Sequence, residues 1–74
     1  MDIDNEKIDE AVLALLYLTL HEEHRAWKGI DFEAMNRLHT KGYIDDPVNK
    51  NKSVWLTDEG LKKSKILFEK LFAK

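Results

Sequence analysis

The fold of this chain is decided by residues 38–61, which read LHTKGYIDDPVNKNKSVWLTDEGL. Gly42 predicts the end of a helix, because glycine readily adopts the left-handed conformation that follows a last helical turn. Residues 43–44 then begin a strand, and residues 45–52 contain the Asp, Pro and Asn residues that are typical of a turn. The chain returns over residues 53–56 as a second strand. The stretch therefore predicts a two-stranded hairpin between two helices.

The second strand leads directly into a final helix. Val54 and Leu56 share one face of the strand and Trp55 takes the other, because side chains alternate along a strand. Thr57 is a typical N-cap residue, and the acidic residues after it suit the positive end of a helix. The stripe of this helix that faces the core is predicted to contain Leu61, Leu67, Phe68, Leu71 and Phe72, with Ile66 nearly opposite.

A short helix over residues 31–41 precedes the hairpin. Asp31 is a good N-cap residue, because its carboxylate can accept a hydrogen bond from a free amide of the first turn. A spacing of three residues predicts that Phe32, Met35 and Leu38 face the core. The side chains expected mostly toward solvent are Glu33, Asn36, Arg37, His39 and Thr40.

The first helix is predicted over residues 4–22, with Asp4 or Asn5 as its N-cap. Apolar residues occupy two faces of this helix, so almost no polar stripe remains in its second half. A chain this short offers little to cover both faces, and we therefore expect a homodimer. The alternative is a central helix wrapped by its own chain, with Tyr17 at the edge. The predicted dimer interface consists of Leu13, Leu16, Tyr17 and Leu20.

Residues 21–30 do not predict one structure, although they could extend the first helix and then turn at Gly29. His21 and His24 are three residues apart, but no third ligand accompanies them, so a polar helix end is expected and no metal site. The chain has no phosphate-binding glycine loop and no nucleophile elbow. We therefore expect no catalytic residues, no cofactor and no enzymatic activity.

The composition describes one domain over residues 1–74. The absence of Cys excludes a disulfide scaffold, a thiol nucleophile and a Cys zinc site. The N-terminus is acidic, unlike a secretion signal, and the longest nearly apolar run, residues 11–20, is too short to span a membrane. These features predict a cytoplasmic protein with no membrane contact.

Charge is divided between the two ends of the chain. Residues 1–24 carry a net charge of −6 and residues 50–74 a net charge of +4, whereas the whole chain carries −2. Such a division is typical of two solvated helices of opposite sign, and it could also steer an acidic partner toward the C-terminal half.

Two resemblances follow from these elements. The wing and the start of the last helix, SVWLTDEGL over residues 53–61, resemble the wing of MarR-type transcription regulators, and LHTKGYI over residues 38–44 resembles the end of a recognition helix. Nearly the whole chain resembles a family of short bacterial proteins of unknown function, through KIDEAVLALLYLTL over residues 7–20 and RAWKG over residues 25–29. The resemblances imply a small winged-helix-like α+β fold of a helix, a short helix, a two-stranded hairpin and a C-terminal helix.

Nucleic-acid binding is one function that this resemblance implies. Arg and Asn side chains can read base edges, and Lys side chains contact phosphates. However, acidic residues flank both the short helix and the wing, the chain is not basic, and the segment before Asp31 is too short for a further supporting helix. The predicted contacts are Asn36, Arg37, His39, Thr40, Lys50 and Lys52.

An aromatic patch of Trp27, Tyr43 and Trp55 is the other candidate, because exposed aromatic residues make good anchors for a protein partner. The alternative is that Trp27 folds over Trp55 and closes a small satellite core. We expect a non-catalytic protein-interaction module that self-associates, with a further protein partner that the sequence does not name. The alternative function is a minimal winged-helix DNA-binding transcriptional regulator.

Overall fold

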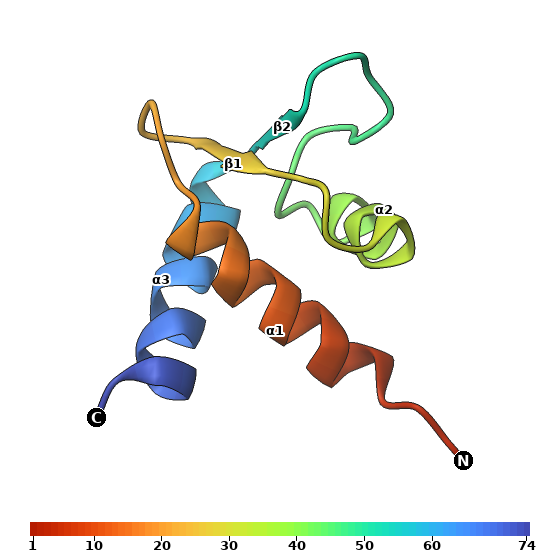
Figure 1. The fold of residues 1–74 in the computed structure, drawn as a ribbon, viewed down its shortest axis with the longest axis vertical. Helices are drawn as coiled ribbons and strands as arrows, with labels where there is room; N and C mark the ends of the chain where they lie inside the picture. The colour runs from red at the N-terminus through yellow and green to blue at the C-terminus, as the bar shows by residue number, and fades with distance from the viewer.

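The chain forms three helices and one small antiparallel sheet in the computed structural model, which describes all 74 residues. The elements follow one another as α1 (Asn5–Leu18), β1 (Arg25–Trp27), α2 (Phe32–Thr40), β2 (Ser53–Trp55) and α3 (Asp58–Phe72). Figure 1 shows α1 crossing the centre of the molecule, with α3 and α2 on either side of it and the two strands above one end. The predicted α+β class is confirmed. None of the helices has the length and apolar composition needed to cross a membrane.

The first helix begins as predicted and ends earlier than predicted. Asp4 caps its start by accepting a hydrogen bond of 3.2 Å from the amide of Lys7. The helix stops at Leu18 and not at residue 22, because Thr19 forms the C-cap and its hydroxyl accepts a hydrogen bond of 3.1 Å from the amide of Trp27. The chain then reverses through Glu22 and Glu23, which have φ angles of 49° and 71°.

The sheet contains one strand that the sequence did not predict. In β1, Ala26 lies opposite Val54 of β2. Residues 21–30, for which no single structure was predicted, therefore contain the strand that pairs with β2 over three residues. The predicted hairpin is present as a single bridge between Ile44 and Leu56, framed by a hydrogen bond of 3.0 Å from the Thr57 amide to the Tyr43 carbonyl. As predicted, Val54 and Leu56 are buried and Trp55 is exposed.

The core surrounds α1 on several sides. Leu13 is 1% exposed and Leu16 is 0% exposed, since α2, α3 and β1 all pack against this helix. The prediction that Leu13 and Leu16 form a dimer interface is therefore wrong: their own chain covers them. Tyr17 and Leu20 are partly buried at the edge of this core. The core consists of Val12, Leu13, Ala14, Leu16, Ala26, Ala34, Met35, Leu38, Ile44, Val54, Leu56 and Leu67.

The second and third helices have the predicted N-caps. Asp31 accepts a hydrogen bond of 3.2 Å from the amide of Ala34, and Thr57 accepts one of 3.0 Å from the amide of Gly60. Phe32 does not face the core as predicted, because it occupies the first position of α2, where the helix passes beyond the edge of the core. Leu71 and Phe72 are half-exposed for the same reason, since they lie in the last turn of α3.

Candidate functional site

An open groove lies between the end of β1, the start of α2 and the loop of residues 46–52. We call it the Trp27 groove. Its volume is about 400 Å³, and Trp27, Phe32 and Val48 are 51%, 58% and 66% exposed around it. Two lysines and no acidic residues are among its lining residues, which are Trp27, Lys28, Gly29, Phe32, Met35, Pro47, Val48, Asn49, Asn51 and Lys52.

The loop side of the groove is held in place by Lys28. Its ammonium group donates hydrogen bonds of 2.7 Å to the carbonyl of Pro47 and 2.8 Å to the side-chain oxygen of Asn49. Its amide also donates to the carbonyl of Lys52 at 3.2 Å. These acceptors are neutral, and Lys28 takes part in none of the four ion pairs of the chain.

The predicted aromatic patch is not assembled. Trp27 lies against Gly29, where a Cβ atom would overlap its indole ring, and it lines the Trp27 groove. Trp55 instead stacks on His24, with ring centroids 5.1 Å apart. Tyr43 lines a separate hollow beside Asp9. The alternative in which Trp27 folds over Trp55 is therefore not seen either.

The two neighbouring histidines lie in the turn before β1 and not at a helix end. The Nδ1 atom of His21 lies 3.1 Å from the carbonyl of Thr19, and the Nε2 atom of His24 lies 3.3 Å from a carboxylate oxygen of Asp58. The structure gathers no group of three or more His, Cys, Asp or Glu side chains in one place.

The residues predicted to contact nucleic acid are divided between solvent and internal contacts. Asn36 and Thr40 are exposed on α2, and Lys50 and Lys52 are exposed in the loop. The ring of His39 is turned back toward the chain, where its Nδ1 atom lies 3.0 Å from the carbonyl of Ile44. Arg37 was expected to lie mostly in solvent, but it forms an ion pair with Asp9 within the chain.

That ion pair belongs to a cluster of Asp9, Arg37 and Lys41, which we call the Asp9 cluster. Asp9 is 2% exposed, and its two oxygens accept hydrogen bonds of 2.9 Å from Nε of Arg37 and 3.0 Å from Nζ of Lys41. The cluster fastens α1 to α2. The sequence contained one signal for it, because Asp9 lies on the same helical face as the buried Leu13 and Leu16.

The Asp9 cluster keeps the carboxylate ionised. Burial on its own raises the pKa of Asp9, but the hydrogen bonds from Arg37 and Lys41, together with their positive charges, outweigh burial. The pKa of Asp9 is therefore lower than usual. The hydrogen bond to Asp9 likewise raises the pKa of Arg37, so the pair stays charged.

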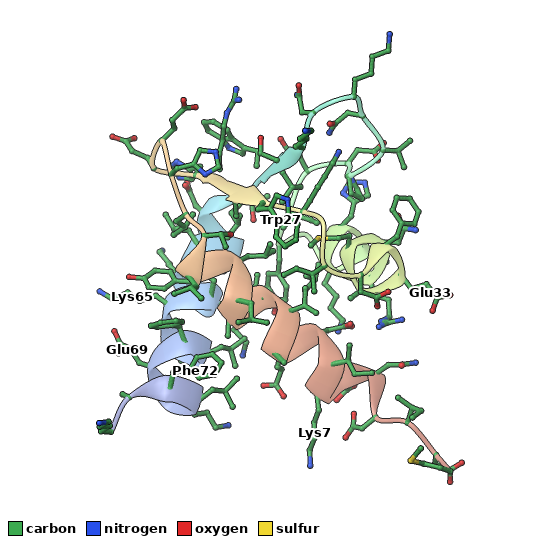
Figure 2. The ribbon with its side chains drawn as sticks, viewed as in Figure 1. Lys7, Trp27, Glu33, Lys65, Glu69 and Phe72 are labelled. Atoms are coloured by element: carbon green, nitrogen blue, oxygen red, sulfur yellow. The ribbon has the colours of Figure 1, made fainter.

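A second apolar surface lies on α1 and α3. The rings of Tyr17 and Phe68 have centroids 5.2 Å apart, and those of Phe68 and Phe72 are 5.3 Å apart. We call these three rings the aromatic ladder. The ladder ends at Phe72, which is half-exposed; Leu18 of α1 and Leu71 of α3 are also exposed. Figure 2 shows Phe72 at the end of α3, far from Trp27 beside the sheet.

Three capped helices, a two-stranded sheet and a loop that returns into the last helix define a small winged-helix-like α+β protein. Residues 4–74 match the family model described as "Domain of unknown function (DUF6429)", and the chain belongs to this family. The chain is similar to "Uncharacterized protein y4hR" of Sinorhizobium fredii (strain NBRC 101917 / NGR234), with 61% identity over 74 residues and 100% of both chains covered. No solved structure matches the chain. The predicted membership of a bacterial family of unknown function is confirmed.

Proposed function

We propose that this protein is a non-catalytic interaction module that self-associates through the aromatic ladder. The observation that carries the proposal is the run of rings from the partly buried Tyr17 and Phe68 to the half-exposed Phe72, because an apolar surface that the chain leaves in water is typical of an interface. Tyr17 belonged to the interface predicted from the sequence. Phe68 and Phe72 replace Leu13 and Leu16, which are buried in the core.

The charges of the two helices favour a second copy as the partner. Residues 1–24 carry −6 and residues 50–74 carry +4, and the lysines of α3 take part in none of the four ion pairs within the chain. A two-fold axis would place α1 of each copy against α3 of the other. Such an arrangement covers the ladder and brings the unpaired charges of opposite sign together.

The first prediction is that Phe72→Glu weakens self-association at least about tenfold, because a carboxylate would be placed at an apolar interface. Sedimentation velocity over a range of protein concentrations measures this change. The matched control is Ile66→Glu, which alters a residue that is also exposed on α3 but lies on its other side. The proposal fails if the wild-type protein stays monomeric at about millimolar concentration, or if the two variants weaken association equally.

The Asp9 cluster makes DNA recognition the less favoured function. Arg37 and Lys41 are both paired with Asp9, and the exposed side chains of α2 include the acidic Glu33 beside the neutral Asn36 and Thr40. We therefore predict that random-sequence duplex DNA at low salt leaves the amide resonances of Asn36, Thr40 and Lys50 unmoved in an NMR titration. Shifts of these resonances that disappear when salt is added would instead establish DNA binding, because binding to phosphates weakens steeply with salt.

A further inference from the structure

We propose that the Trp27 groove binds an extended acidic peptide segment that presents one bulky apolar side chain. This surface is separate from the aromatic ladder, since the groove is built by β1, α2 and the loop of residues 46–52, and the ladder by α1 and α3. Figure 1 shows α2 and α3 on different sides of the molecule. Both surfaces are therefore free to be occupied at the same time.

The apolar part of the groove fits one inserted side chain. Met35 is fully buried and Pro47 is buried, so they form the floor, while Trp27, Phe32 and Val48 stand exposed around it. A cavity of about 400 Å³ is within the size range of pockets that take small ligands. Burying an aromatic or aliphatic side chain there would cover apolar surface that the chain leaves in water.

The groove is shaped before any partner arrives. Asp46 accepts a hydrogen bond of 2.9 Å from the amide of Val48, and Asn49 accepts one of 2.8 Å from the amide of Asn51. The ammonium group of Lys28 holds Pro47 and Asn49 against the strand. A preformed site loses less conformational entropy on binding than a flexible loop does, which favours an occupant for this surface.

The charged residues that line the Trp27 groove favour an acidic partner. Lys28 and Lys52 line the groove, no Asp or Glu lines it, and neither lysine belongs to an ion pair within the chain. The three acceptors of Lys28 come from Pro47 and Asn49, so its donors are occupied, whereas no carboxylate of the chain lies within ion-pair distance of its ammonium group. A carboxylate of the partner is therefore expected to contact Lys52 directly and to be attracted by Lys28 at longer range.

The outer edge of β1, beside the groove, already forms hydrogen bonds with residues of the same chain. A peptide is therefore not expected to add to this edge as a further strand. The amide of Trp27 donates to the hydroxyl of Thr19, and the amide and carbonyl of Arg25 are both bonded to His21. The partner must therefore be held by its side chains, with an apolar anchor in the groove and carboxylates at its lysine side.

The test selects peptides from a random twelve-residue phage-displayed library on the immobilised full chain, with counter-selection on the Phe32→Ser variant. We expect the enriched peptides to combine a large apolar residue with Asp or Glu. Their affinity, measured by isothermal titration calorimetry, should fall about tenfold in Phe32→Ser and in Lys52→Glu. Ile66→Ser is the matched control, because it removes an exposed apolar side chain from another surface.

The same experiment separates this inference from self-association, because Phe72→Glu should bind the selected peptides as the wild-type chain does. The proposal is overturned if selection enriches no peptide, if the enriched peptides lack acidic residues, or if Phe32→Ser and Lys52→Glu bind them unchanged. It is also overturned if Phe32→Ser converts an oligomer to a monomer in sedimentation velocity, since a second copy would then occupy the groove. Phe32 and Lys52 are exposed, so circular dichroism should show all these variants folded.

Discussion

Gly60→Ala is expected to destabilise the protein by about 3 kcal/mol or more, which would leave a chain of this size close to unfolding. Gly60 lies in the first turn of α3, where the backbone of Tyr43 passes so closely that a Cβ atom would overlap its carbonyl oxygen. The neighbouring atom belongs to the backbone and not to a flexible side chain, so the segment that contains Tyr43 or the helix α3 would have to move.

Close packing and helix propensity predict changes of opposite sign in the stability of Gly60→Ala. Alanine favours a helix over glycine by about 1 kcal/mol, so helix propensity alone predicts that Gly60→Ala stabilises the protein. Urea unfolding followed by circular dichroism measures the difference. Gly42→Ala is the comparison, because Gly42 has a φ of 82° and no neighbouring atom near its missing Cβ. That variant should lose only about 1 kcal/mol from backbone strain, and equal losses in the two variants would refute the argument from close packing.

Asp9→Asn is expected to lower the free energy of unfolding by about 1–3 kcal/mol at neutral pH, and to remove part of its pH dependence. The substitution keeps the size of the side chain but removes the anion that Arg37 and Lys41 share. The loss stays below that of a fully buried pair, because the two cations are partly exposed and can turn to water.

The pKa of Asp9 in the folded protein sets the pH range of this effect. Because the pKa of Asp9 is lowered by folding, the carboxylate contributes its full stability above about pH 4, its unfolded pKa. That stability is lost as the pH falls through the folded pKa. Urea unfolding at pH values above and below this range should therefore show the wild-type chain and Asp9→Asn converging in acid.

Two controls assign the effect to the Asp9 cluster. Glu69→Gln removes an equal charge from an exposed site on α3 and should leave both the stability and its pH dependence nearly unchanged. Arg37→Gln should cost less in the Asp9→Asn background than in the wild-type chain, because the shared hydrogen bonds are already lost. Additive losses would show that the two side chains do not stabilise the fold through each other.

The parts of the fold that were predictable from sequence depend on near neighbours. Asp31 and Thr57 cap the helices that follow them, and the alternation around Trp55 gives its strand the correct faces. These signals depend on residues that are close together in the sequence, so they can be recognised without knowledge of the tertiary structure. The strand β1 has only three residues and exists because Val54 lies opposite Ala26, so no local pattern revealed it.

The helix α1 shows where periodicity stops being informative. Its pattern correctly required burial on several faces, but it did not say whether the cover came from the same chain or from a second copy. The structure gives the first answer for Leu13 and Leu16. Likewise, periodicity placed Phe32 on the core side of α2 but could not show that the core is reached only one turn later, at Met35.

The candidate site was predictable only in part. Trp27 was identified as an anchor, whereas Phe32, Val48 and Lys28 were missed as its companions. One signal was available, since Val48 is an apolar residue inside a turn made of Asp, Pro and Asn residues. The contacts of Lys28 with Pro47 and Asn49 join segments about twenty residues apart, and such pairings are not encoded in any short motif.

The loop of residues 46–52 can gain residues at its exposed tip, at Lys50, at little cost to the rest of the protein. It is fastened at one end by Lys28 and at the other by the pairing of β2 with β1. Doubling the length of a flexible loop costs only about 0.6 kcal/mol of closure entropy. Residues inserted at the loop tip would therefore reshape the wall of the Trp27 groove and leave the three helices and the sheet as they are.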